Sequence, residues 1–306
     1  MTDANWLGVV LPLGGAAVAC LALLLPVRCE IQGGSLSLPL WDAGRACIFL
    51  LLFAALVLAS NQVDPLGEWA PLRVALDYGG TLGLLALVFL PAARGRAAGW
   101  ARAGFGPLPP AAVFWLVVLM AGVAVFRLVL LTYVPCNCPA LDPRALGWVR
   151  VAASAAFTGF LVPLGEEVLY RGMALPLIGV RAGRWGGTLL AAISWAMVHG
   201  ERPLLPLIVL GVALGKLTLG TGSLWPSIGF HIAWNAAVVG YEVYGRVVGL
   251  EGAGPVPAPV IFFAVVGLVL GWAQLLDAGR AGAVWITLRE GAPGAAAESR
   301  PEGGAP

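Results

Sequence analysis

Two adjacent glutamates followed by an arginine have the residue types and spacing for chemistry, in the run Gly165-Glu-Glu-Val-Leu-Tyr-Arg171. Glu167 and Arg171 are four positions apart, so on a helix they share one face and can form an ion pair. Glu166 is turned about 140° away from Arg171 by the helical period. The arginine is therefore poorly placed to neutralise Glu166. We expect Glu167 to support the structure and Glu166 to be available as a base.

The chain contains two histidines, and both lie downstream of this run. His199 ends the segment Trp195-Ala-Met-Val-His199, and His231 opens the segment His231-Ile-Ala-Trp-Asn235. A histidine and an asparagine one helical turn apart can present two hydrogen-bond donors to one oxygen. Together with a free carboxylate and a second imidazole, they are the parts of a hydrolase that activates water. General-base help is worth about 10²- to 10⁴-fold in rate, and losing one oxyanion donor costs about 10²- to 10³-fold.

The elements that must position these residues are transmembrane helices. Hydrophobic residues make up 59% of the 306 positions and charged residues 11%, against roughly 25% charged in soluble domains. Uncharged stretches of about 20 residues recur along the chain, which is the length that spans a bilayer as a helix. Such stretches are too long for the strands of a membrane barrel. The sequence therefore predicts an all-α, polytopic transmembrane bundle of eight to nine spans.

We expect nine apolar spans, of which the second and the sixth are short for a bilayer crossing. They are Trp6–Pro26, Ala46–Ser60, Val74–Ala93, Ala111–Tyr133, Leu146–Leu164, Trp185–His199, Pro203–Leu219, Leu224–Tyr244 and Ala258–Leu276. This layout contains a conflict, because it puts Glu166 at the inner end of one span and His199 at the outer end of the next. The two can meet only if a boundary is misplaced.

Four segments follow from these spans. Residues 1–145 are N-terminal transmembrane helices of unknown role, 146–245 a catalytic helical core, 246–277 the last transmembrane helix, and 278–306 a disordered cytoplasmic tail rich in Gly, Ala, Pro and Glu. Most Lys and Arg residues fall on one side of the nine crossings, so we expect the N-terminus outside and the C-terminus in the cytoplasm. The high Ala, Gly and Arg content suggests a bacterial inner membrane.

The net charge of +2 gives no reason to expect a nucleic-acid partner. The expected partners are the lipid bilayer and a membrane-associated protein or peptide substrate. Without a catalytic role, the two glutamates would be a charge cluster at a helix end. His199 would then be a hydrogen-bonded residue at the membrane interface. A non-proteolytic scaffold or immunity-type protein and a transporter therefore stay open as alternatives.

Three ordered motifs resemble those of the CPBP intramembrane proteases, which include the CAAX prenyl endopeptidases and bacterial Abi-like proteins. The run from Glu166 to Arg171 is similar to EExxxR, and the run from His231 to Asn235 is similar to HxxxN. The run from Trp195 to His199 is similar to FxxxH, with Trp where Phe is usual. The resemblance covers residues 150 to 245.

The resemblance implies an intramembrane endopeptidase, glutamate-type or metal-dependent, that cleaves a membrane-associated or C-terminally processed protein. It assigns catalytic roles to four residues, with Glu166 and His199 activating water and His231 and Asn235 forming the oxyanion site. The supporting residues are Glu167, Arg171 and Trp195. No cofactor is required. Zinc or another divalent metal stays open, with Glu166, His199 and His231 as its ligands, although the chain has no HExxH motif.

Overall fold

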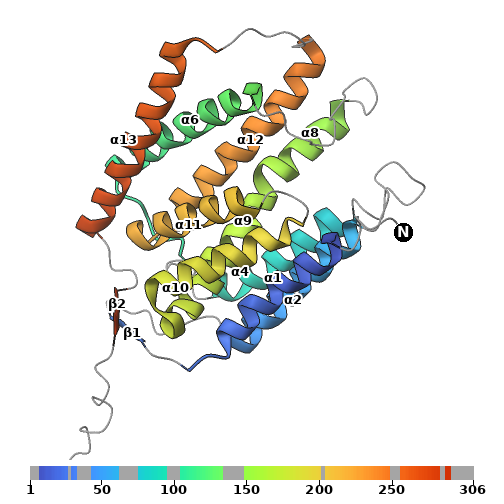
Figure 1. The fold of residues 1–306 in the computed structure, drawn as a ribbon, viewed down its shortest axis with the longest axis vertical. Helices are drawn as coiled ribbons and strands as arrows, with labels where there is room; N and C mark the ends of the chain where they lie inside the picture. Colours follow the sequence, from blue (N-terminus) through green and yellow to red (C-terminus); the bar gives the residue numbers. More distant parts are fainter. Residues whose placement is uncertain are drawn as a thin grey trace, which may run out of the picture.

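The structure is a computed structural model, and it describes residues 7–26, 29–32, 43–61, 75–94, 104–133, 148–200, 204–248, 256–282 and 287–290. The fold is a bundle of helices (Figure 1), as the sequence predicts. The first part of the chain forms α1 (Leu7–Leu23), α2 (Ala43–Asn61), the π-helix η2 (Ala75–Gly80), α4 (Thr81–Arg94) and α6 (Pro110–Tyr133). The last part forms α11 (Leu204–Thr221), α12 (Trp225–Val248) and α13 (Ala258–Gly282).

Between these two parts runs a long, irregular helical segment. It consists of α8 (Trp148–Ala156), the π-helix η3 (Phe157–Leu161), α9 (Val162–Glu167), the π-helix η4 (Val168–Ala174) and α10 (Leu175–Val198). Within α10, Gly183 has φ 75° and ψ 170°, and the helix is broken there. The segment is thus a helical hairpin, with one arm before Gly183 and a second arm after it.

In the part of the chain that the structure describes, five segments are long and apolar enough to cross a membrane, so the chain is an integral membrane protein. They are Ala43–Ser60, Pro110–Leu131, Val151–Val198, Leu204–Thr221 and Ala258–Asp277. The expected eight to nine spans are not confirmed. Part of the difference lies in Val151–Val198, which is one apolar segment by length but turns back at Gly183. Another part lies in α1, where the apolar helix Val10–Leu23 is short for a bilayer crossing.

The hairpin corrects one predicted boundary. The fifth span was expected to end at Leu164, because Glu166, Glu167 and Arg171 lower the hydropathy after it. In the structure the helix continues through these residues to the break at Gly183. The charged side chains do not end the helix because they are buried and have partners inside the protein.

The helices pack on both sides of the hairpin. Helix α1 lies against α10 and α2, whereas α6 packs with α12 and α13. One hydrophobic cluster includes Leu50, Tyr170 and Trp195, and a second includes Leu119 and Leu214. Glycines allow the closest helix approaches, as transmembrane packing favours. An added Cβ at Gly122 of α6, for example, would meet the backbone of α13 at 2.5 Å.

A small sheet lies at one end of the bundle (Figure 1). Its strands β1 (Cys29–Gln32) and β2 (Thr287–Glu290) pair antiparallel, with Cys29 opposite Glu290. Both α13, which ends at Gly282, and β2 extend into the segment that the sequence predicts to be disordered from residue 278. The pairing satisfies backbone groups of β2 through a partner more than 250 positions away, as the Cys29 and Glu290 register shows. Local composition carries no signal for such a contact. The last sixteen residues, 291–306, lie outside the described residues.

Replacing Gly183 by Ala tests the hairpin turn. Its φ and ψ belong to a region that is essentially restricted to glycine, so we expect a loss of about 1–3 kcal/mol in the free energy of unfolding. Space is not the cause, because no atom lies within 4 Å of the added Cβ. The matched control is Gly83→Ala in α4, where the Cβ also meets nothing within 4 Å and the helix favours Ala by up to about 1 kcal/mol. Equal unfolding midpoints for the two variants in detergent would contradict the turn geometry.

Candidate active site

The hairpin places Glu166 beside His199. Glu166 lies 17 positions before Gly183 and His199 lies 16 positions after it, so the two arms return the chain to the same level. The Oε2 atom of Glu166 is 3.8 Å from Nε2 of His199. The conflict between the predicted spans therefore disappears once the helix is allowed to continue past Leu164.

Trp195 is the residue that joins the parts of this cluster. Its indole Nε1–H donates a hydrogen bond of 2.7 Å to Oε2 of Glu166, and its ring is 1% exposed. The ring centroid lies 4.5 Å from that of His199 and 5.5 Å from that of His231. The guanidinium carbon of Arg171 lies 4.8 Å from the ring centroid, within cation–π range. A phenylalanine at this position could pack similarly but could not donate to Glu166.

Glu167 is enclosed by two partners. Its Oε1 atom accepts a hydrogen bond of 2.9 Å from Nη1 of Arg171 and lies 2.9 Å from Nδ1 of His231. The second guanidinium nitrogen of Arg171 donates to the backbone oxygen of Gly211 in α11 at 3.2 Å. Glu167 is 0% and Arg171 2% exposed. The predicted helical ion pair is present, and it also holds His231, a contact that sequence spacing did not suggest.

The partners of the two imidazoles fix which ring nitrogen carries a proton. Nδ1 of His199 lies 2.9 Å from the backbone oxygen of Trp195, and a carbonyl oxygen can only accept. Nδ1 of His231 faces the carboxylate of Glu167, which also accepts when ionised. Both Nδ1 atoms are therefore donors, and both Nε2 atoms face Oε2 of Glu166 at 3.8 Å. That separation leaves no direct hydrogen bond and is open to a bridging water.

Asn235 lies one turn beyond His231 and contacts the opposite helix. Its Nδ2 donates to the backbone oxygen of Thr158 in η3 at 3.1 Å. Pro163 helps to explain why this oxygen is available. The N–H of Val162 bonds to Phe157 instead, and Pro163, the next residue, has no N–H to donate. Asn235 thus satisfies a carbonyl that the helix leaves without its usual partner, and its amide retains a second N–H.

The cluster of Glu166, His199 and His231 is nearly enclosed, and its most exposed member is His199. The side chains of Glu166 and His231 are 8% and 3% exposed, whereas that of His199 is 14% exposed. Water therefore has its best access along His199, at the end of α10.

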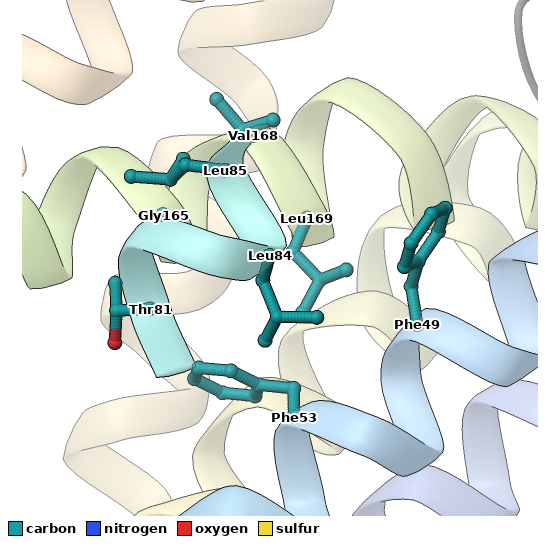
Figure 2. A pocket seen from close by; sticks show the side chains of 8 residues that line it. All are labelled: Phe49, Phe53, Thr81, Leu84, Leu85, Gly165, Val168 and Leu169. Carbon is teal, nitrogen blue, oxygen red and sulfur yellow. The ribbon is translucent and has the colours of Figure 1, made fainter. Parts of the chain in front are cut away.

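Two apolar spaces lie near the helices that carry the site. One of about 470 Å³ is lined by residues from α4, the segment before α6, α6, η3, α9 and α12, namely Phe89, Phe105, Leu116, Met120, Phe160, Leu164, Trp225, Ile228, Gly229 and Ile232. The second, of about 20 Å³, lies between α2, α4 and the α9–η4 helix, where Thr81 and Leu85 approach Gly165 (Figure 2). Only the first is large enough for part of a substrate.

The donor set does not form a ready-made metal site. Within the described ranges, no group of three or more His, Cys, Asp or Glu side chains has an arrangement that could hold a metal ion. The Glu166 oxygen that faces both imidazoles also accepts the indole N–H of Trp195. The zinc or other divalent metal that the sequence leaves open, with Glu166, His199 and His231 as ligands, stays a prediction.

Residues 148–237 match the family model described as type II CAAX prenyl endopeptidase Rce1-like. This segment is similar to the Rce1-like proteases. The match agrees with the resemblance to the CPBP proteases, and it contains Glu166, His199 and His231, whose side chains converge, together with Trp195 and Asn235. It lies inside the predicted core of residues 146–245. Comparisons with curated proteins and with solved structures give no match.

The matched segment has further contributors to the site that sequence reasoning missed. Two are backbone oxygens, of Gly211 for Arg171 and of Thr158 for Asn235. A backbone acceptor leaves no signal of its own in a sequence. The proline at position 163 was the available indication that a carbonyl nearby would be freed.

The histidine tautomers can be measured directly, because the chain has two histidines. We expect ring-¹⁵N-labelled protein in lipid to show a protonated Nδ1 on both imidazoles, since each faces an acceptor at 2.9 Å. Assignment follows from His199→Gln and His231→Gln, each of which removes one ring. A spectrum in which either imidazole is protonated at Nε2 and unprotonated at Nδ1 would contradict the contacts to Trp195 and Glu167.

Proposed function

We propose that the chain is an intramembrane endopeptidase in which Glu166 activates the water that attacks a peptide bond. The Rce1-like family is a protease family, and its matched segment carries the site. The observation that carries the proposal is the convergence of both imidazole Nε2 atoms on one oxygen of Glu166, each at 3.8 Å. A water between these groups could lose a proton to the carboxylate as it attacks.

The difference between the two glutamates supports Glu166 as the base. Glu167 has its Oε1 committed to Arg171 and His231, and a proton on this carboxylate would leave the buried guanidinium of Arg171 without an ionised partner. Glu166 has one direct donor, the indole of Trp195, and is slightly exposed beside His199. Its carboxylate is held in place yet can take up a proton. We assign His199, whose Nδ1 is held by the Trp195 carbonyl, to help position the water through Nε2.

We assign His231 and Asn235 to the oxyanion site. Nδ1 of His231 lies 2.9 Å from Glu167, which holds the ring, and its Nε2 faces the side of Glu166 where the water would lie. When Nε2 carries a proton, it can donate to the oxyanion that forms at the attacked carbonyl. The second N–H of Asn235 would be the other donor.

The large apolar space supports a substrate segment that is itself apolar. Ile228 and Ile232 of its wall flank His231 along α12, and Leu164 lies two positions before Glu166. A chain that occupies this space would bring its backbone next to the reacting groups. We therefore propose a membrane-associated or C-terminally processed protein as the substrate.

The distribution of basic residues supports an orientation in the membrane. Arg181 and Arg184 flank the hairpin turn, and Nζ of Lys216 lies 4.6 Å from the ring centroid of Trp185 beside it. Basic residues favour the cytoplasmic side. We place the hairpin turn there, in a bacterial inner membrane, with the N-terminus outside and the C-terminus in the cytoplasm.

The Glu166→Gln variant tests this function. We expect loss of cleavage by at least about 10²-fold, because an amide cannot act as the base, with the protein still present in the membrane at its normal level. The measurement is a comparison of the new termini of membrane proteins in cells that carry wild-type or variant protein. Asp277→Asn on the exposed part of α13 is the matched change from carboxylate to amide and should leave the termini unchanged.

Glu167→Gln separates support from catalysis. It leaves the buried guanidinium of Arg171 without its ionised partner, a change that typically costs about 3–5 kcal/mol. We expect the amount of folded protein to fall, unlike with Glu166→Gln. Retained cleavage in Glu166→Gln cells would exclude the protease mechanism. If Glu166→Gln instead abolished transport of a solute while no terminus changed, the transporter alternative would take its place.

A further inference from the structure

Helix α1 lies outside the segment that matches the Rce1-like family, yet it contacts the part of α10 that carries the site. The side chain of Ser194 is fully buried. Its hydroxyl donates a hydrogen bond of 2.6 Å to the backbone oxygen of Gly15. Ser194 immediately precedes Trp195 and lies five positions before His199. This contact therefore joins α1 to the helical turns from which the indole and the imidazole project.

Gly15 allows this contact because it has no side chain. A Cβ at this position would lie 2.6 Å from the backbone oxygen of Ser194 and 3.0 Å from Cβ of Met197. Neither atom can move without the backbone of α10. Ordinary van der Waals contact begins at 3.4 Å, so the two helices would have to separate by about 0.8 Å at the level of Ser194.

The neighbouring Gly14 provides a contrast on the same helix. A Cβ there would meet the terminal methyl carbon of Met197 at 2.8 Å. That atom is the end of a flexible side chain, which can turn aside without moving α10. Two adjacent glycines thus face the same helix, but only at Gly15 does the added carbon meet the backbone.

We propose that Gly15 and Ser194 form an anchor through which α1 positions Trp195 and His199 against Glu166. This inference rests on the proposed function, because it concerns the alignment of the same site. The two residues are positioning residues and do not touch the reacting atoms. The anchor acts through α10. The hydrogen bond from the Ser194 hydroxyl to Gly15 holds this helix in one position. In that position the Trp195 indole is 2.7 Å from Oε2 of Glu166, and Nε2 of His199 is 3.8 Å from the same oxygen.

The test compares Gly15→Ala with Gly14→Ala in purified protein in lipid. The substrate probe is an internally quenched peptide that spans a bond identified by the comparison of termini. A misplacement near 1 Å can cost about 10²-fold in rate, so for Gly15→Ala we expect kcat to fall about 10- to 100-fold. KM should change by less than about twofold, because neither Gly15 nor Ser194 lines the large apolar space. Gly14→Ala should have nearly wild-type constants.

A second readout does not depend on catalysis. In ring-¹⁵N-labelled protein, Gly15→Ala should shift the signals of His199 and leave those of His231 in place, since His231 is held by Glu167 on another helix. Ser194→Ala removes the hydroxyl without adding an atom and covers the case in which Gly15→Ala does not fold. It should shift the same His199 signals and lower kcat by about tenfold, less than the largest loss expected for Gly15→Ala, because it releases α10 without pushing the helix away.

The outcomes separate the anchor from the function. If Glu166→Gln abolishes cleavage but Gly15→Ala and Ser194→Ala keep both kcat and the His199 signals, the anchor is wrong and the function stands. If Glu166→Gln keeps cleavage while the His199 signals still shift in Gly15→Ala, the anchor stands and the proposed mechanism is wrong. An equal loss in Gly14→Ala and Gly15→Ala would also overturn the anchor, because general crowding between the helices would then explain both.

Discussion

The buried ion pair between Glu167 and Arg171 is the interaction on which the site depends. Each charge alone would be expensive at membrane depth, and together they let the helix continue through a charged run to the turn at Gly183. The pair has contacts on two other helices, since Glu167 binds His231 of α12 and Arg171 binds the Gly211 backbone of α11. Three helices are therefore fixed around one carboxylate, and the neighbouring Glu166 remains for chemistry.

Trp195 connects this support to the reacting groups. Its ring lies beside the guanidinium of Arg171 and both imidazoles. Its indole N–H donates to Glu166, and its backbone oxygen accepts from Nδ1 of His199. One residue thus determines the position of the base and the tautomer of its neighbour. Because the position of α10 fixes Trp195, any helix that packs on α10 influences the site. This gives α1, outside the family match, a physical connection to it.

The sequence predicted the membrane bundle and singled out Glu166, His199 and His231, whose side chains the structure brings together, because charges and imidazoles in apolar helices are rare and their spacing is readable. The end of the span before Glu166 was predicted wrongly, because hydropathy counts a charge without knowing its partner. The contact between His231 and Glu167 joins residues 64 positions apart. It depends on how α12 packs against α9, which helical periodicity cannot supply. Asn235 was predicted as an oxyanion donor, and its bond to Thr158 depends on the π-helical register before Pro163.

A density map of the wild-type protein in lipid nanodiscs, at a resolution that shows side chains, tests the central claim most directly. We predict that Oε2 of Glu166 lies at hydrogen-bond distance from the Trp195 indole nitrogen and about 3.8 Å from Nε2 of both histidines. A Glu166 carboxylate more than about 10 Å from both imidazoles, beyond the reach of a bridging water, would contradict the convergence and the chemistry derived from it.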